Sequence, residues 1–326
     1  MLYKLYKLNF LTPVHFGSEK QGTSLENVSV TCHSDTFFSA ICNEFIKLYD
    51  ELYFDDYKDL FEEGKILITS LFPYVGEHLF IPKPSIIVER QNAKDVEYKN
   101  KKKMKKLEFI KISEFKHYLE CLKSGEPFVF DEKDYEFAKY SDSPKVALRI
   151  NDDNNKIYHV GAYSFKQDSG LYFVAKFEDE NYIDQFENII ESLQYSGIGG
   201  KRSSGYGKFE LYDVVELDDN LLPSEETLLE LLQSDGSYQM TLSLVSPDED
   251  ELECDFSNSY YNLIKREGFV YSVDYADSLV KRKNLVMFKE GSCFDFDIKG
   301  TIQDVSDNGK HPVYRYGKSI KIGVNV

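Results

Sequence analysis

The sequence predicts an α+β protein of two ferredoxin-like domains, with an arm inserted in the first. The first half alternates strand-like and helix-like periods in the order strand, helix, strand, insertion, strand, helix, strand, the order of a ferredoxin-like βαββαβ unit. The chain of 326 residues contains 24 Tyr and 24 Phe, both of which favour strands, and no Trp. We expect a first domain over 1–216, a connection over 217–236 and a second domain over 237–326.

The elements of the first domain follow from the spacing of its apolar residues. Residues 2–10 alternate as a half-buried strand, and residues 34–53 carry apolar residues at helical spacing. Ser34 or Asp35 is placed to cap that helix. Five residues of Asn and Asp at 151–155 indicate a hairpin turn. The remaining expected elements are strands at 65–71, 78–81, 145–150, 156–165, 171–177 and 208–215, and helices at 113–123 and 181–195.

The second half is richer in strand-like runs than the first. A polar, helix-prone stretch at 217–236 connects the two halves. The expected strands lie at 238–245, near 269–273, at 285–288, 293–298 and 300–305, and within 313–324. This composition suits a second, more β-rich ferredoxin-like unit.

The net charge of −17 argues against a protein that binds a polyanion with its whole surface. Screening at physiological salt makes contacts local, however, and the cations of this chain are gathered in a few places. They lie in a run from Lys99 to Lys111, at Lys201 and Arg202, at 281–283, and from 310 to 321. The rest of the surface is then acidic, which suits a subunit that docks against a basic neighbour.

The cysteines and the N-terminus indicate the cellular compartment. The five cysteines show neither CxxC pairing nor metal-ligand spacing, so we expect reduced thiols, no bound metal and no cofactor. Residues 1–17 alternate polar and apolar side chains and lack the apolar core of a signal peptide. Because the sequence also lacks a run of 18 apolar residues, we expect a cytoplasmic protein without a membrane partner.

The segment 85–112 has the character of an arm inserted into a folded domain, because Gln, Asn and Lys replace a core pattern. Its lysines either contact RNA phosphates or form a solvated loop, and their position within an otherwise acidic protein favours RNA. The lysines that we assign to RNA binding are Lys101, Lys102, Lys103, Lys105 and Lys106.

The segment 197–207 combines glycines, two adjacent cations and two adjacent hydroxyls. The residues that we assign to RNA binding here are Gly197, Gly199, Gly200, Lys201, Arg202, Ser203, Ser204, Gly205 and Tyr206. Glycine permits positive φ and lets a phosphate approach main-chain N–H groups. The cations supply charge, and the hydroxyls can donate to phosphate or ribose oxygens. Such chemistry recognises a nucleic-acid backbone without reading its sequence.

Two other interpretations of this loop are less consistent with the residues. The segment lacks the Walker spacing GxxxxGK[ST], and it follows a helix and precedes a strand, the reverse of a P-loop. An ordinary connection between a helix and a strand needs only one or two glycines and rarely places Lys-Arg-Ser-Ser among five.

Two other groups of residues carry possible chemistry. His15 and His33 flank the first strand and the first helix, and a His near neutral pKa can act as general acid or base or can touch RNA. No acid–base pair follows from the sequence, and we assign both to RNA binding and expect no catalytic residue. The acidic run 248–253 lacks the ligand spacing and central glycine of a calcium loop.

At this point a family resemblance is clear. The run GIGGKRSSGYGKF from Gly197 resembles the glycine-rich loop of the RAMP superfamily of CRISPR proteins, which are built from RRM-like ferredoxin folds. The form GGKRSSGYG is typical of Csm subunit four of type III-A complexes, in the Cas-five group. Residues 33–41 resemble its first-helix motif, and 311–318 resemble its C-terminal motif.

The resemblance implies a non-catalytic RNA-binding subunit of the interference complex. It would hold the 5′ repeat-derived tag of the crRNA and contact the large polymerase-like subunit and the backbone RAMP subunit of the filament. A β-hairpin thumb would meet target RNA near the junction between tag and guide, and we place that thumb at about 85–112. Two alternatives are a RAMP-family endoribonuclease that cuts repeat RNA through His15 or His33, and a scaffold whose loop never meets RNA.

Overall fold

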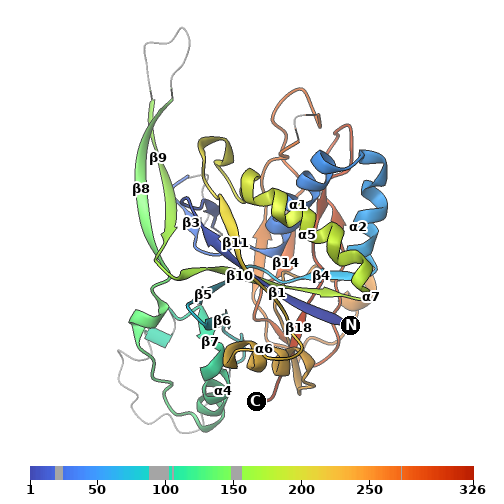
Figure 1. Ribbon diagram of the computed structural model, residues 1–326. Helices are drawn as coiled ribbons and strands as arrows, with labels where there is room; N and C mark the ends of the chain where they lie inside the picture. Colours follow the sequence, from blue (N-terminus) through green and yellow to red (C-terminus); the bar gives the residue numbers. More distant parts are fainter. Residues whose placement is uncertain (19–24, 88–102, 105, 148–155, 273) are drawn as a thin grey trace.

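A computed structural model of the chain describes residues 1–18, 25–87, 103–104, 106–147, 156–272 and 274–326 (Figure 1). Among these residues the largest sheet has seven strands, in the order β11-β1-β10-β5-β6-β7 with β4 also paired to β10. Its strands are β1 (Leu2–Phe10), β4 (Ile66–Ile68), β5 (Phe72–Val75), β6 (His78–Pro82), β7 (Phe109–Lys111), β10 (Ser169–Phe177) and β11 (Phe209–Glu216). Mixed helix and strand content is confirmed.

Six elements of the first half follow the predicted order of strand, helix, strand, strand, helix, strand. They are β1, α1 (Ser34–Leu48), β4, β10, α5 (Ile183–Ser196) and β11. β10 runs antiparallel to β1 and to β4, and β1 runs antiparallel to β11. In the resulting order β11-β1-β10-β4, the first and third of these strands in the sequence, β1 and β10, lie between the other two, as in a ferredoxin-like unit.

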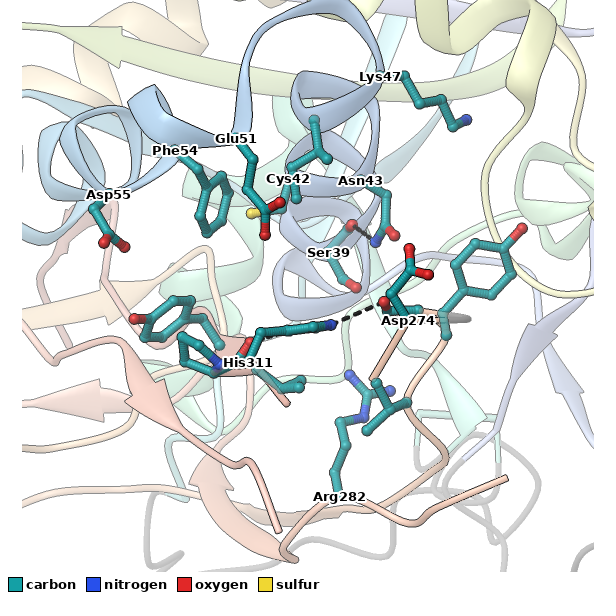
Figure 2. A pocket seen from close by; sticks show the side chains of 17 residues that line it. Ser39, Cys42, Asn43, Lys47, Glu51, Phe54, Asp55, Asp274, Arg282 and His311 are labelled. Carbon is teal, nitrogen blue, oxygen red and sulfur yellow. Dashed lines mark hydrogen bonds between the residues drawn. The ribbon is translucent and has the colours of Figure 1, made fainter. Parts of the chain in front are cut away.

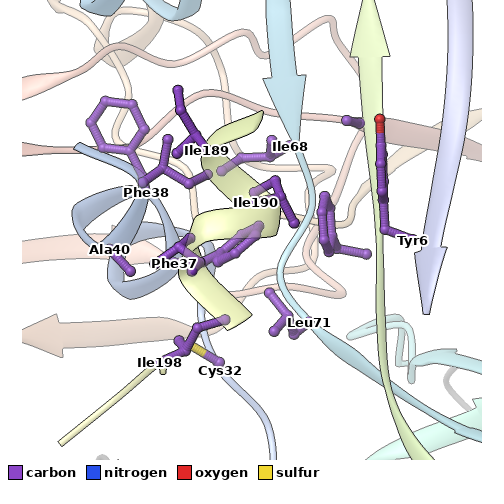
Figure 3. Packing of buried hydrophobic residues seen from close by; sticks show 14 of the residues in the cluster. Tyr6, Cys32, Phe37, Phe38, Ala40, Ile68, Leu71, Ile189, Ile190 and Ile198 are labelled. Atoms are coloured by element: carbon purple, nitrogen blue, oxygen red, sulfur yellow. The ribbon is translucent and has the colours of Figure 1, made fainter. Parts of the chain in front are cut away.

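Helices α1 and α5 cover one face of this sheet with the main apolar core between them (Figure 3). Phe37 and Phe38 of α1 and Ile189 and Ile190 of α5 are fully buried there. Tyr6 of β1 stacks on a neighbouring strand's Phe173, with ring centroids 4.8 Å apart. The predicted helix over 34–53 ends earlier, at Leu48, and is followed by a 3₁₀ turn (Glu51–Tyr53) and by α2 (Phe54–Glu62), which the sequence analysis missed.

The opposite face of the sheet packs on one helix of the first half and on elements that follow the first half. The helix-prone connection is indeed a helix, α6 (Pro223–Gln233), whose Leu228 and Leu232 enter this second core. α4 (Phe115–Ser124) and a sheet in the order β15-β12-β18 complete it. The strands of that sheet are β12 (Tyr238–Thr241), β15 (Cys293–Phe294) and β18 (Lys321–Val324).

The rest of the second half consists of short ribbons. The paired strands are β13 (Leu263–Arg266) with β14 (Leu285–Phe288), and β16 (Gln303–Asp304) with β17 (Tyr314–Arg315). The helix α7 (Glu249–Leu252) has four residues. The strand expected near 269–273 is reduced to one bridge between Phe269 and Lys281. The second ferredoxin-like unit therefore stays a prediction.

A long β-hairpin projects from the body (Figure 1). Its strands β8 (Ala138–Ala147) and β9 (Lys156–Phe165) pair along their whole length, and the predicted turn at 151–155 lies outside the described residues. β8 begins at Ala138, seven residues before the expected 145. The sequence did not reveal this start because the side chains of residues 138–146 are exposed or partly buried, and such a strand shows no apolar alternation. A short ribbon of β2 (Phe16–Gly17) and β3 (Val28–Ser29) lies at its base.

No helix in the described part of the chain is both long enough and apolar enough to cross a lipid bilayer.

Candidate RNA-binding site

The glycine-rich loop begins where α5 ends and is anchored in the main core. Gly197 follows the helix with φ of 75°, and the next residue, Ile198, is fully buried. Figure 3 shows the Ile198 side chain beside Cys32 at one end of the core. The N–H of Ile198 donates to the carbonyl of Gly207, 3.0 Å away, so the two ends of the loop are joined. The loop is therefore a fixed turn whose centre alone is free to reach a ligand.

Gly199 and Gly200 lie against the segment that follows β1. A Cβ at Gly199 would lie 2.8 Å from Phe16, and one at Gly200 would lie 2.7 Å from the ring of His15. The N–H of Gly200 donates to the carbonyl of His15, 2.9 Å away. These glycines therefore permit close packing within the protein. The sequence predicts that they admit a phosphate to main-chain N–H groups, but the N–H of Gly200 is already bonded to the protein.

The tip of the loop carries the cations and hydroxyls. Lys201 adopts a left-handed conformation with φ of 60° and precedes a 3₁₀ turn, Arg202–Ser204. Lys201 and Arg202 are partly exposed, and Ser203 and Ser204 are exposed. Four consecutive donor side chains are thus at least partly exposed, and they can meet phosphate and ribose oxygens. Gly205 (φ 86°) ends the turn, and Tyr206 beyond it is partly buried.

Two tyrosines that the sequence analysis did not single out flank these cations. The ammonium of Lys201 lies 5.2 Å from the ring centroid of Tyr158 on β9. The guanidinium carbon of Arg202 lies 4.4 Å from the ring centroid of Tyr271 in the second half. Each cation–π contact is worth about 0.5–1 kcal/mol at an exposed site, enough to favour one orientation of a long side chain. Neither tyrosine carries a sequence signal, because only folding brings it to the loop.

His15 connects the loop to the projecting hairpin. Its Nδ1–H donates to the carbonyl of Gly161 on β9, 2.8 Å away, while its ring packs on Gly200. The imidazole is buried, with 8% of the residue exposed. The structure thus brings His15 to the predicted loop, in a packing position.

His33 is buried in a different polar cluster. Its Nδ1–H donates to Glu290, 2.8 Å away, and the hydroxyl of Ser70 donates to the same carboxylate. Burial alone raises the pKa of Glu290, but His33 and Ser70 outweigh that effect, and the pKa lies below its ordinary value. His33 also occupies the N-cap position of α1 without a side-chain cap bond.

The predicted capping role of Ser34 and Asp35 is wrong. The helix begins at Ser34, whose hydroxyl accepts from the N–H of Leu244 in the second half. Asp35 accepts two bonds of 2.8 and 2.9 Å from Arg266 and pairs with Arg315 as well. Burial raises the pKa of Asp35, but the two guanidiniums outweigh it and hold the pKa well below its usual range. Long-range ion pairs took the place of a local cap.

The first-helix motif and the C-terminal motif are in contact. In addition to the pair of Asp35 and Arg315, the rings of Phe38 and Tyr316 lie 5.3 Å apart. The hydroxyl of Tyr316 accepts from the N–H of Ile68, 3.0 Å away. Residues from the two ends of the chain therefore form one packed unit behind the loop.

Comparisons with known proteins agree with this picture. A family profile described as "RAMP superfamily" matches residues 7–210, and one described as "CRISPR Csm4 C-terminal domain" matches residues 234–324. A Streptococcus thermophilus protein called CRISPR system Cms protein Csm4 is 30% identical, over 98% of this chain and 98% of its own length. This chain belongs to the Csm4 family of type III CRISPR complexes.

Other Csm4 proteins are similar over nearly the whole chain. The one of Mycobacterium tuberculosis (strain CDC 1551 / Oshkosh) is 29% identical, over 97% of this chain and 96% of its own. Among solved structures, a chain of a Csm3-Csm4 subcomplex of the type III-A interference complex has a TM-score of 0.66, with 21% identity and 100% of both chains covered. A chain of a Csm1-Csm4 cassette with pppApA has a TM-score of 0.62, with 20% identity and coverage of 99% and 98%. These structures share the fold.

In this Csm4-family chain the described part of the lysine run and the glycine-rich loop lie at opposite edges of the large sheet. The loop leads into β11, the first strand of the sheet order, and the run leads into β7, the last. Lys103 is 3.1 Å from Glu132, and Lys106 is exposed. Lys101, Lys102 and Lys105 lie outside the described residues. The described lysines are thus not part of the surface around Lys201.

In the part of the chain that the structure describes, no cluster of three or more His, Cys, Asp or Glu side chains has the arrangement of a metal site.

Proposed function

We propose that this chain is a non-catalytic subunit of a Csm complex that holds the 5′ repeat-derived tag of the crRNA on its glycine-rich loop. The observation that carries the proposal is the tip of that loop, where the consecutive residues Lys201, Arg202, Ser203 and Ser204 are all at least partly exposed. Cations and hydroxyls can bind the phosphates and sugars of a nucleic-acid backbone without reading its bases. The flanking rings of Tyr158 and Tyr271 offer faces on which unpaired bases can stack.

The projecting hairpin suits the thumb better than the lysine arm does. β8 and β9 form a β-ribbon that extends from the body, and its base is joined to the loop through His15 and Gly161. A strand of RNA held by Lys201 would therefore run along β9. We propose that this hairpin, in place of the segment 85–112, lies near the junction of tag, guide and target RNA.

The proposed partners are the large polymerase-like subunit and the backbone RAMP subunit. Relatives with the same fold have been solved together with Csm1 in one case and with Csm3 in another. We propose that this chain makes corresponding contacts and so connects the two. The acidic surface that remains outside the loop suits docking against basic neighbours.

The first test removes the two cations at the loop tip. In the assembled complex, the double variant Lys201→Ala/Arg202→Ala should weaken binding of tag RNA, and the slope of log K against log salt should fall by about 1.4, at roughly 0.7 for each phosphate on a single strand. The control is Lys116→Ala/Lys123→Ala on α4, which removes the same charge from exposed positions. An unchanged slope in the loop variant would favour the scaffold alternative.

A second test addresses the site of contact and the nuclease alternative. Photo-crosslinking of the complex should attach the tag to peptides containing 197–207 and β9; tag crosslinks confined to other subunits would refute the proposal. The endoribonuclease alternative requires cleavage of repeat RNA that is lost in His15→Ala or His33→Ala. Both imidazoles are buried and hydrogen-bonded to protein groups, so we expect the isolated chain to leave repeat RNA intact.

A further inference from the structure

A cavity of about 670 Å³ lies beside α1 (Figure 2). It is bounded by α1 and the start of α2 on one side and by residues 270–272, 274 and 311–314 of the second half on the other. Its walls include the aromatic rings of Phe54, Tyr271 and Tyr314 and the polar side chains of Ser39, Asn43 and Arg282. Both halves of the chain are needed to form it.

Arg282 is the unusual member of this wall. Figure 2 shows its side chain entering the cavity from the side opposite α1. The Nε atom is buried and has no hydrogen-bond partner in the described part of the chain. A buried N–H without a partner costs free energy, so such a group in a folded protein indicates a missing ligand, ion or water.

The surroundings of Arg282 carry an excess of positive charge. Arg266, Arg315 and Arg282 share one carboxylate, Asp35, whose two oxygens are already occupied by the first two. Glu290, the other buried carboxylate nearby, is paired with His33. Burial, followed by the charge of Arg315, lowers the pKa of Arg282 to about 10, so it remains a cation at neutral pH. Nε and Nη2 of Arg315 also have no partner among the described residues.

These features select an anion that carries an aromatic group. A guanidinium binds phosphate through charge-assisted hydrogen bonds. The rings of Phe54 and Tyr314 offer apolar faces for a base, and Asn43 offers an amide. Exposed carboxylates at the rim, such as Asp274, disfavour a highly charged anion but can accept from ribose hydroxyls. A nucleotide with a single phosphate satisfies all of these groups.

The cavity adjoins the loop through one residue. Tyr271 forms part of its wall, and the same ring faces the guanidinium of Arg202. We propose that this cavity is a second RNA-ligand site, in which Arg282 binds the phosphate of one nucleotide. The assignment of that nucleotide to an RNA strand rests on the proposed function, whereas the phosphate site itself does not.

The test uses the full chain and three probes: adenosine 5′-monophosphate, inorganic phosphate and a short single-stranded oligoribonucleotide. Calorimetric titration should detect the mononucleotide, and Arg282→Gln should weaken that binding by about ten-fold or more, the usual loss for a hydrogen bond to a charged group. Lys281→Gln, which removes the exposed neighbouring cation, should change nothing. Inorganic phosphate should bind more weakly than the mononucleotide, because it lacks the base and ribose.

The outcomes separate the two sources of phosphate and the two sites. Loss of oligoribonucleotide affinity in Arg282→Gln identifies an RNA strand as the source, whereas loss confined to the mononucleotide identifies a free nucleotide. If the mononucleotide binds Lys201→Ala/Arg202→Ala as it binds the wild type, its site lies outside the loop. If Arg282→Gln, shown by near-ultraviolet circular dichroism to be folded, binds every probe as the wild type does, the inference is overturned. If RNA affinity is unchanged in Lys201→Ala/Arg202→Ala but falls in Arg282→Gln, the proposed function of the loop is contradicted and the inference about the cavity stands.

Discussion

Asp35, in the first turn of α1, pairs with Arg315, 280 residues later in the chain, and both side chains are almost completely buried. The same carboxylate also binds Arg266, so three segments converge on one charge. A buried charge is tolerated only where it is paired and hydrogen-bonded. The contact therefore ties the first helix to the C-terminal motif and makes the two halves dependent on each other.

Removal of the charge at Asp35 should destabilise the whole chain. Asp35→Asn leaves the buried guanidiniums of Arg266 and Arg315 without their carboxylate, and breaking a buried pair in this way costs about 3–5 kcal/mol. Urea unfolding measures the loss. Asp56→Asn on α2 removes an exposed carboxylate and should change the free energy of unfolding by less than about 0.5 kcal/mol. Equal effects of the two substitutions would show that the buried pair contributes nothing.

The same carboxylate should govern part of the response to acid. The pKa of Asp35 in the folded chain is held well below its unfolded value of about 4, so its stabilising contribution is complete above that pH and is lost as the pH falls toward the folded pKa. The stability advantage of the wild type over Asp35→Asn should therefore shrink by about 1 kcal/mol between pH 7 and pH 3. Urea titrations at several pH values test this, and a constant difference would contradict the assigned shift.

Two glycines at the end of the loop should respond differently to alanine. Gly205 and Gly207 both have positive φ, 86° and 75°, so alanine strains the backbone at either position. A Cβ at Gly205 meets open space, whereas one at Gly207 overlaps the carbonyl oxygen of Ile198. Gly207→Ala should therefore cost at least about 2 kcal/mol more than Gly205→Ala. Thermal unfolding compares the pair, and equal losses would mean that the loop ends rearrange freely.

The sequence predicted the large sheet and its helices where the apolar pattern is strong. β1 coincides with the expected strand at 2–10. The bounds of β10, α5 and β11 each lie within two residues of the expected bounds, and α6 lies inside the stretch expected to be helix-prone. These elements bury one face, so their periodicity is read directly. β8 was misplaced because neither of its faces is buried, and the pattern that marks a strand is then missing.

The sequence predicted the residues of the loop but not the side chains that contact them in the folded chain. The loop motif identified Lys201 and Arg202, yet Tyr158 and Tyr271, which contact them, lie on strands or segments distant in the sequence. The misassigned cap has the same origin. Asp35 has the residue type and position of a helix cap, and only tertiary contact with Arg315 gives it another partner.

A substitution at Arg282 should stabilise the ligand-free chain, the opposite of the effect expected for Asp35→Asn. Its guanidinium lacks a carboxylate of its own and lies near two other cations, so the folded state carries repulsion and an unsatisfied donor. Arg282→Gln should raise the free energy of unfolding of the ligand-free chain by about 1 kcal/mol, as substitutions at strained binding sites often do. In Asp35→Asn the three guanidiniums repel one another without a carboxylate between them. Adding Arg282→Gln to that variant should therefore raise the free energy of unfolding by more than it does in the wild type. A urea-unfolding double-mutant cycle measures this coupling. If Arg282→Gln instead destabilises both backgrounds equally, Arg282 is a packing residue and the excess charge behind the cavity has no energetic consequence.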